Sequence, residues 1–231
     1  MKLKSLIIIL FITGMTQIAN SQPVLEIPNA DLNLGIFPQN STIVHDFWFK
    51  STGSETLKIS EIRTGCACAV LPLERKSIAP GDSMKVTMTW NVEVQMGRAL
   101  IIPRIYTNAG DVVYKIEMRG LVIDEPESSP IISVLPYRLE FAKIYDRDID
   151  SIDFQISNKF EHDLMLRKTS PSSDKYKIIL PEVINGLSAA IGTIILNKEY
   201  ADTEFISYLT FEATDPSNTK ITVPIRRKIY K

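Results

Sequence analysis

The sequence contains few of the residues on which most enzyme active sites depend. Its 231 residues include two cysteines, Cys66 and Cys68, and two histidines, His45 and His162. This scarcity gives little support to a Cys–His or Ser–His–Asp catalytic arrangement. The chain also lacks a Gly-x-Ser-x-Gly nucleophile motif, a glycine-rich phosphate loop and a His-Glu-x-x-His zinc motif. We therefore expect a protein that is not an enzyme and that carries no cofactor.

The chain also lacks an excess of charge and a long apolar segment. Its 26 basic and 27 acidic side chains give a formal net charge of −1, so the basic surface typical of nucleic-acid binders is absent. The apolar run Leu6–Ile12 is far shorter than the ~20 residues that cross a bilayer, and we expect no transmembrane anchor. The short basic run Arg226-Arg227-Lys228 is expected to be a solvated end.

The N-terminus has the features of a secretory signal peptide. Lys2 and Lys4 precede the apolar run, and Ala19-Asn20-Ser21 offers small residues at the positions that a signal peptidase requires. We predict that residues 1–21 are removed, which leaves 210 residues from Gln22 to Lys231 with a net charge of −3, since the segment carries two lysines and no acid. The protein is therefore expected to be exported, to the periplasm or the cell surface.

Two-residue alternation of apolar and polar side chains dominates the sequence after the signal peptide. In 84–92, five apolar residues (Met84, Val86, Met88, Trp90 and Val92) alternate with polar ones, which predicts a strand with one buried face. Segments 43–49, 57–62 and 112–118 are interpreted in the same way. Turn-forming residues separate them, as at Pro80-Gly81-Asp82. Roughly seven short strands in about a hundred residues are typical of an immunoglobulin-like β-sandwich.

The composition predicts two such domains. Residues 124–130 are polar and proline-bounded, which is typical of a linker, so we predict one sandwich at 22–123 and a second at 131–231. Four apolar positions, Leu32, Phe47, Leu57 and Ile59, have apolar counterparts 107 residues later at Leu139, Phe154, Leu164 and Leu166. The second domain is therefore expected to be a diverged repeat of the first. The fold class predicted is all-β, with two tandem immunoglobulin-like sandwiches.

The motifs of the first half occur in a recognisable order. Leu34-Gly35-Ile36-Phe37, the strand at Leu57–Ile59, Cys66-Ala67-Cys68, the turn at Pro80-Gly81 and a last strand entering Gly120 follow one another. Over residues of about 24–122 this order resembles the DUF1573 family, exported immunoglobulin-like domains related to ASH and MSP-like modules. The resemblance implies a fold and a compartment but no reaction. Where the family typically has Cys-Gly-Cys-Thr, this chain has alanine at 67, which predicts that a tight left-handed turn between the thiols is disfavoured.

Cys66 and Cys68 are the chain's conspicuous reactive side chains. On an extended strand their Cα atoms would lie ~6.6 Å apart, at the upper limit of disulfide geometry. They are interpreted as an inert pair, packed or oxidised. The alternative is a redox-active dithiol or a soft two-sulfur site, for which copper(I) fits better than four-coordinate zinc.

Other polar residues are expected to have ordinary structural roles. His45 shares the buried face of its strand with Phe47 and Phe49, and His162 is predicted to lie in a solvated turn. The stretch Asp146–Asp150 begins like a calcium loop, but Ser151 stands where an EF-hand needs glycine and Ser157 where it needs glutamate. A solvated acidic turn is therefore predicted.

The leading functional hypothesis is a non-catalytic structural or protein-interaction module of the cell envelope, whose partner is a protein or another envelope component. The alternative is a thiol redox or copper-handling protein that uses Cys66 and Cys68. A third hypothesis, suggested by the size and the paired sandwiches, is a two-domain chaperone of the PapD-like type. The sequence leaves the oligomeric state open.

Overall fold

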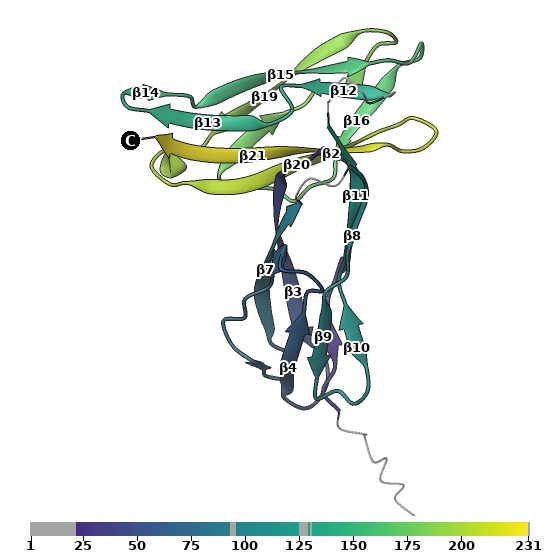
Figure 1. Cartoon of the computed structure of the whole chain (residues 1–231), viewed down its shortest axis with the longest axis vertical. Helices are drawn as coiled ribbons and strands as arrows, with labels where there is room; N and C mark the ends of the chain where they lie inside the picture. The colour runs from purple at the N-terminus through teal and green to yellow at the C-terminus, as the bar shows by residue number, and fades with distance from the viewer. Residues whose placement is uncertain (1–21, 93–95, 125–128, 130, 231) are drawn as a thin grey trace, which may run out of the picture.

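The computed structural model describes residues 22–92, 96–124, 129 and 131–230, and in this part of the chain nearly all regular structure is β (Figure 1). The predicted signal peptide and most of the predicted linker lie outside the described residues. The strands of the first half are β1 (Leu25–Glu26), β2 (Asp31–Pro38), β3 (Ser41–Ser51), β4 (Leu57–Arg63), β5 (Ala69–Val70), β6 (Ser77–Ile78), β7 (Ser83–Val92), β8 (Gly97–Ile101), β9 (Arg104–Thr107), β10 (Val113–Lys115) and β11 (Glu117–Ile123).

The strands of the second half are β12 (Ile132–Leu135), β13 (Leu139–Ile144), β14 (Arg147–Asp148), β15 (Ser151–Asn158), β16 (Leu164–Lys168), β17 (Tyr176–Ile179), β18 (Val183–Ile184), β19 (Ala189–Leu196), β20 (Phe205–Ala213) and β21 (Lys220–Tyr230). A 3₁₀ turn, η2, occupies Lys198–Tyr200. The described residues contain no helix long and apolar enough to cross a membrane.

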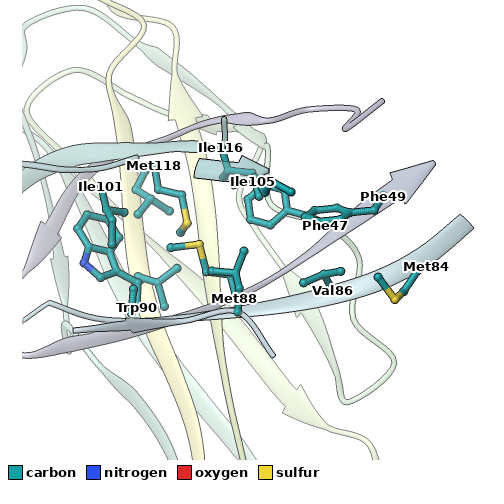
Figure 2. Packing of buried hydrophobic residues seen from close by; sticks show 14 of the residues in the cluster. Phe47, Phe49, Met84, Val86, Met88, Trp90, Ile101, Ile105, Ile116 and Met118 are labelled. Carbon is teal, nitrogen blue, oxygen red and sulfur yellow. The ribbon is translucent and has the colours of Figure 1, made fainter. Parts of the chain in front are cut away.

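Each half of the chain forms its own sandwich with its own core. In the first, β1-β3-β7-β5 forms one sheet, and its inner side chains face those of β8, β9 and β11. Figure 2 shows Met88 and Trp90 of β7 opposite Met118 and Ile101. In the second, β12-β15-β19-β17 covers the sheet that contains β20 and β21. The predicted class, all-β with two tandem immunoglobulin-like sandwiches, is confirmed.

The alternation predicted for 84–92 is confirmed, whereas that for 112–118 is wrong in part. All five apolar residues of β7 are buried. The second segment is divided at Ile116 between β10 and β11, which belong to different sheets. Val112 lies directly before β10 with more than half of its surface exposed, while Ile116 and Met118 are buried. Alternation places side chains on faces but does not reveal where a strand passes from one sheet to another.

The strand pairing repeats along the chain with the offset seen in the sequence. Leu25 of β1 pairs with Ser51, and Ile132 of β12 pairs with Asn158; both partners in the second pair lie 107 residues later. The parallel pair Leu32 with Met118 recurs at the same offset as Leu139 with Ile225. The two sandwiches therefore share both strand order and register, as expected of an internal repeat.

The two sandwiches meet through a continuous sheet. It runs β18-β16-β20-β21-β2-β11-β8, and β2 of the first sandwich lies beside β21 of the second, in parallel, with Ile36 opposite Ile221. β13 pairs with the C-terminal half of the same edge of β21. In Figure 1 the strands of the second sandwich run across those of the first, and β2 and β11 reach up to β21. Strand β2 is thus shared by both halves.

A bulge at Gly35 makes this junction possible. Gly35 has φ +65°, and the register between β2 and β11 shifts at this point. A Cβ atom at Gly35 would lie 2.0 Å from the carbonyl oxygen of Lys220. Next to it, the Thr222 hydroxyl donates a hydrogen bond to the Leu34 carbonyl oxygen (2.5 Å). Only glycine allows β21 to approach this closely.

Arg227 corrects the prediction that the C-terminal basic run is a solvated end. Arg226 and Lys228 are exposed, but Arg227 faces the interior of the second sandwich with 1% of its surface exposed. Its guanidinium donates to both carboxylate oxygens of Asp148 (2.7 and 3.1 Å) and to the carbonyl oxygen of Phe141. The alternation of β21 places every second side chain inside, whatever its charge.

Candidate functional site

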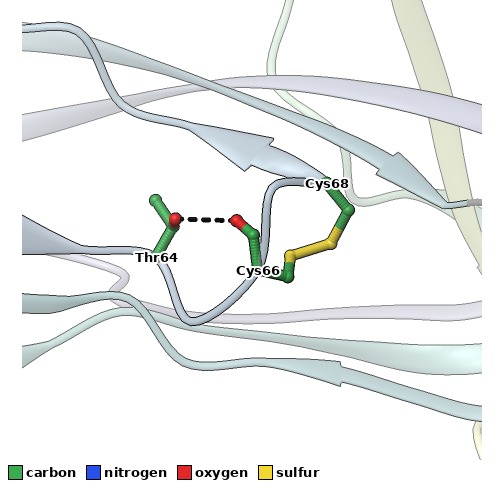
Figure 3. Close-up of a disulfide and its surroundings, with 3 residues drawn as sticks. All are labelled: Thr64, Cys66 and Cys68. Carbon is green, nitrogen blue, oxygen red and sulfur yellow. Dashed lines mark hydrogen bonds between the residues drawn. A yellow bond between two sulfur atoms is a disulfide. The ribbon is translucent and has the colours of Figure 1, made fainter.

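Cys66 and Cys68 lie in a turn between β4 and β5 and are bonded to each other (Figure 3). The Thr64 hydroxyl donates a hydrogen bond to the Cys66 carbonyl oxygen (2.9 Å). On the other side, the Asn91 backbone N–H of β7 donates to the Cys68 carbonyl oxygen (2.8 Å). Cys66 is exposed, whereas Cys68 is half-buried and packs against the first core. The two sulfur atoms therefore have different environments.

This turn corrects one expectation from the sequence and agrees with another. The cysteines are not on an extended strand: their Cα atoms are 5.2 Å apart, within the ordinary range for disulfides. Ala67 is not among the described residues with positive φ; instead, Gly65 takes φ +86°, with open space where a Cβ would be. The chain therefore reverses before the first cysteine, and alanine between the two cysteines is tolerated.

A groove of about 560 Å³ connects the disulfide to strand β8. We call it the disulfide groove. One wall is the cysteine turn with the end of β7, and the other is β8 with the segment that leads into β9. Its lining comprises Thr64, Gly65, Cys66, Cys68, Trp90, Asn91, Val92, Arg98, Ala99, Leu100, Ile101, Ile102 and Arg104. The groove thus combines a disulfide, apolar side chains and two arginines.

Strand β8 ends the nine-stranded sheet at this groove. It pairs with β11 on one side, from Gly97 opposite Val122 to Ile101 opposite Met118. On its other side, no strand of the described part of the chain pairs with it. We call this side the β8 edge. An edge strand presents unpaired backbone N–H and C=O groups, which are a template for another strand.

The electrostatics of the groove are positive. Arg98 and Arg104 both line it, and none of its lining residues in the described part of the chain is acidic. Among the described residues, neither arginine forms a salt bridge. Two guanidinium groups without carboxylate partners favour an anionic ligand group, particularly a carboxylate that can accept two parallel hydrogen bonds.

His45 lies on the same face of β3 as Phe47 and Phe49, as predicted, but its partner comes from the second sandwich. Its Nδ1 atom and the Tyr208 hydroxyl of β20 are joined by a hydrogen bond of 2.5 Å. Tyr208 is almost fully buried and packs into the core of the first sandwich. Burial lowers the pKa of His45, against an opposing effect of Asp46, and burial also raises the pKa of Tyr208 well above its usual value. A neutral His–Tyr pair therefore links the two sandwiches.

Around this pair lies an interdomain cleft of about 850 Å³. Trp48 and Lys85 line it from the first sandwich, and Asp174 and Ile206 from the second. Its lining carries lysines as well as carboxylates, so unlike the disulfide groove it has no dominant charge. The cleft follows from the shared sheet, because the two sandwiches diverge on either side of β2 and β21.

The other candidate residues have structural roles. His162 lies in an exposed turn and stacks on Phe160, with ring centroids 4.8 Å apart. The calcium-like stretch 146–150 uses Asp148 to neutralise Arg227, so that carboxylate is already engaged. In the part of the chain that the structure describes, no three His, Cys, Asp or Glu side chains gather into a metal site. With the sulfurs of Cys66 and Cys68 bonded to each other, copper binding would first require reduction.

The sequence did not reveal Arg98, Arg104 or Tyr208 as functional candidates. Arg98 and Arg104 lie 30 or more positions after the cysteines, and the fold brings them to the groove. Tyr208 sits in an apolar strand, where a tyrosine is an ordinary core residue. Pro103 is the residue from which the edge could have been predicted. A proline predicts a break between two strands, and a strand that ends between Arg98 and Arg104 can leave an edge near both arginines.

The fold is that of paired immunoglobulin-like sandwiches with an open edge in the first. Residues 25–122 match the DUF1573 family, described as "Protein of unknown function (DUF1573)". The resemblance drawn from Leu34-Gly35, the cysteine pair and the Pro80-Gly81 turn is thereby confirmed. The match covers the first sandwich, which contains the disulfide groove and the β8 edge.

Solved structures with a similar fold share little sequence with this chain. A protein of unknown function from Porphyromonas gingivalis W83 is 10% identical, with 88% of this chain and 99% of that chain covered and a TM-score of 0.37. The human CEP192 ASH/PapD-like domain 7 is 11% identical, with coverage of 54% and 98% and a TM-score of 0.38. The CsuC–CsuE chaperone–subunit complex of Acinetobacter baumannii is 12% identical, with coverage of 90% and 100% and a TM-score of 0.34. No curated protein matches the chain.

Proposed function

We propose that this protein is a non-catalytic protein-interaction module of the cell envelope that binds an extended, acidic segment of a partner protein along the β8 edge. The observation that carries the proposal is that β8 ends its sheet beside a groove instead of beside another strand. Addition of a strand to such an edge is a common mode of peptide recognition. Backbone hydrogen bonds supply affinity, and pockets for alternate side chains supply specificity.

The groove suits every second side chain of an added strand. A strand beside β8 would direct alternate side chains towards the groove. Its lining residues Trp90 and Ile101 are already buried, with 4% and 6% of their surface exposed, so the apolar surface still available is that of Leu100. Leu100 is 56% exposed beside the same edge. An incoming apolar side chain would therefore bury existing apolar surface, which favours binding by ~25 cal/mol per Å².

The charge of the groove selects the partner. Arg98 and Arg104 stand at the two ends of the segment 98–104, and neither forms an ion pair with a residue that the structure describes. A segment with carboxylates near these positions would neutralise both, and a basic segment would be repelled. The net charge of the whole chain is close to zero, so this preference is local to the groove.

The second sandwich supports the first in this proposal. We place the domains at residues 22–123 and 131–231, with 124–130 as the linker. The sheet shared by β2 and β21 holds the two together, so the orientation of the β8 edge is fixed relative to the second domain. The location in the envelope rests on the predicted signal peptide, residues 1–21.

Site-specific photo-crosslinking in the native cell envelope tests the proposal. A photoreactive residue replaces Leu100 at the β8 edge, and a control replaces Ile191, which is equally exposed (56%) on the second sandwich. We expect a crosslinked partner protein at position 100 and none at 191. Crosslinking at 100 should fall at least tenfold in Arg98→Glu/Arg104→Glu, whereas reversal of the exposed Arg147 in β14 should leave it unchanged.

Two results would refute the proposal. One is crosslinking at position 100 that is no stronger than at 191. The other is crosslinking that is unaffected by the double charge reversal, since the acidic character of the partner segment would then have no role.

A further inference from the structure

The Cys66–Cys68 disulfide lies in the same groove as the edge on which the partner segment is placed. We infer that it is a covalent capture site: the thiol of a cysteine in the docked segment exchanges with this disulfide and tethers the partner reversibly through Cys66. This inference rests on the proposed function and adds a chemical step to it. The ligand class is an acidic protein segment that carries a reactive cysteine.

The exposure of the two sulfurs sets the direction of the exchange. Cys66 is exposed, and its carbonyl oxygen accepts a hydrogen bond from Thr64, within the same turn. Cys68 is half-buried against the first core and is fixed to β7 through Asn91. An incoming thiolate therefore reaches the Cys66 sulfur, and Cys68 is the leaving group.

The bonds and electrons balance without an external oxidant. The partner thiol loses its proton to solvent, and its thiolate attacks Cys66 Sγ. A new S–S bond forms between the partner and Cys66 as the Cys66–Cys68 bond breaks, and the electron pair leaves on Cys68 Sγ as a thiolate. Attack of that thiolate on Cys66 Sγ reverses the step and releases the partner thiol, so the tether is reversible.

The surroundings of the disulfide favour this reaction. Arg98 and Arg104 line the groove and stabilise both thiolates, that of the partner as it approaches and that of Cys68 as it leaves. The disulfide closes a loop of only three residues, so it restrains little of the unfolded chain. An exposed disulfide that contributes little to stability, in a basic groove beside a free strand edge, suits exchange better than a structural role.

Thiol exchange with defined peptides tests the inference. Two ten-residue peptides share strand-forming residues and one central cysteine; one carries four glutamates and the other four lysines. The full mature chain with its disulfide intact is mixed with each reduced peptide at low ionic strength, quenched with acid and analysed by mass spectrometry. We expect a mixed disulfide at Cys66 that forms at least tenfold faster with the acidic peptide. The difference should vanish in 0.5 M salt and in Arg98→Glu/Arg104→Glu.

A third peptide, acidic with serine in place of cysteine, separates this inference from the proposed function. If it binds at the β8 edge but the two thiol peptides exchange at equal rates, or the adduct forms at Cys68, covalent capture is refuted and the interaction module stands. If the serine peptide does not bind, both are refuted. The variant Cys66→Ser/Cys68→Ser should bind the serine peptide as the parent chain does, and loss of that binding would show that the disulfide only shapes the groove.

Discussion

Replacement of Gly35 by alanine tests whether the shared sheet holds the two sandwiches together. Gly35 lies at φ +65°, and an added Cβ would stand 2.0 Å from the carbonyl oxygen and 2.3 Å from the carbonyl carbon of Lys220. Real Cβ atoms do not approach backbone atoms so closely, and backbone cannot swing away as a flexible side chain can. Gly35→Ala must therefore separate β2 from β21 or distort both.

The size of the effect follows from two contributions. A left-handed backbone costs a residue with a Cβ roughly 1–2 kcal/mol, and overpacking of a tight contact typically costs about 1–3 kcal/mol. We expect Gly35→Ala to lower the free energy of unfolding by about 2–5 kcal/mol. The matched control is Gly81→Ala, because Gly81 has φ +78° but open space where its Cβ would be; it should lose about 1–2 kcal/mol from the backbone alone.

Urea unfolding followed by fluorescence measures the free energy of unfolding of both variants. Small-angle scattering reports the arrangement of the two sandwiches. In a chain of this size, each kcal/mol lowers the midpoint of thermal unfolding by about 2–4 °C, so the two variants should differ by several degrees. Gly35→Ala should also increase the radius of gyration, and Gly81→Ala should not. Equal losses of stability in the two variants, with unchanged scattering, would refute the role given to the β2–β21 contact.

Three further predictions concern single groups. Burial lowers the pKa of His45 below its usual 6.5, so its contribution to stability is complete above pH 6.5 and is lost as the pH falls towards the folded pKa. His45→Gln should flatten this part of the pH dependence of stability, which is measured from urea midpoints between pH 5 and 8. The variant Cys66→Ser/Cys68→Ser should lose only about 1–2 kcal/mol of unfolding free energy in urea, because the entropy of closing a three-residue loop is worth roughly 1.6 kcal/mol. A loss above about 4 kcal/mol would indicate that the disulfide is structural. Asp148→Asn leaves the buried Arg227 without its ion-pair partner and should cost about 3 kcal/mol, at the low end for a broken buried pair because Asp148 is itself partly exposed. Arg147→Gln, at the neighbouring exposed position of β14, should cost less than about 0.5 kcal/mol.

Burial alternation made the sandwiches predictable, because an antiparallel strand with one solvated face shows its inner residues every second position. It identified all five buried residues of β7 and the face of His45. The 107-residue repeat was also visible, since the same strands bury the same positions in both copies. Alternation also explains why the prediction for Arg227 was wrong. The charge of Arg226-Arg227-Lys228 predicts a solvated end, but Arg227 lies at an inward position of β21.

The functional surfaces were less predictable because they depend on pairing between distant segments. Arg98 reaches the cysteines only through the β8–β11 pair, and Tyr208 reaches His45 across 163 positions. The position of the turn beside the cysteines could not be predicted from the pattern. The residue in the left-handed conformation is Gly65, directly before the first cysteine, and not Ala67 between the two.

Pro103 marks one difference between the two sandwiches. Pro103 stands 107 residues before Thr210, in the middle of the strand that is continuous in the second copy as β20. There the Thr210 carbonyl oxygen accepts backbone hydrogen bonds from Thr169 and Ser170, so the segment after β16 covers that edge. Pro103 has no N–H to contribute to a ladder, and the first copy is divided there into β8 and β9, in different sheets.

The two residues that donate to Thr210 in the second sandwich correspond, 107 positions earlier, to Ile62 and Arg63 at the end of β4, which pair with Ile105 and Arg104 of β9. In the first copy the cysteine turn is held to β7 at Cys68, and the disulfide groove separates it from β8. The β8 edge therefore follows from where this pairing ends: among the described residues β4 pairs with β9 as far as Arg104 and not with β8. The second sandwich has no cysteine and is joined to the first through the sheet that they share.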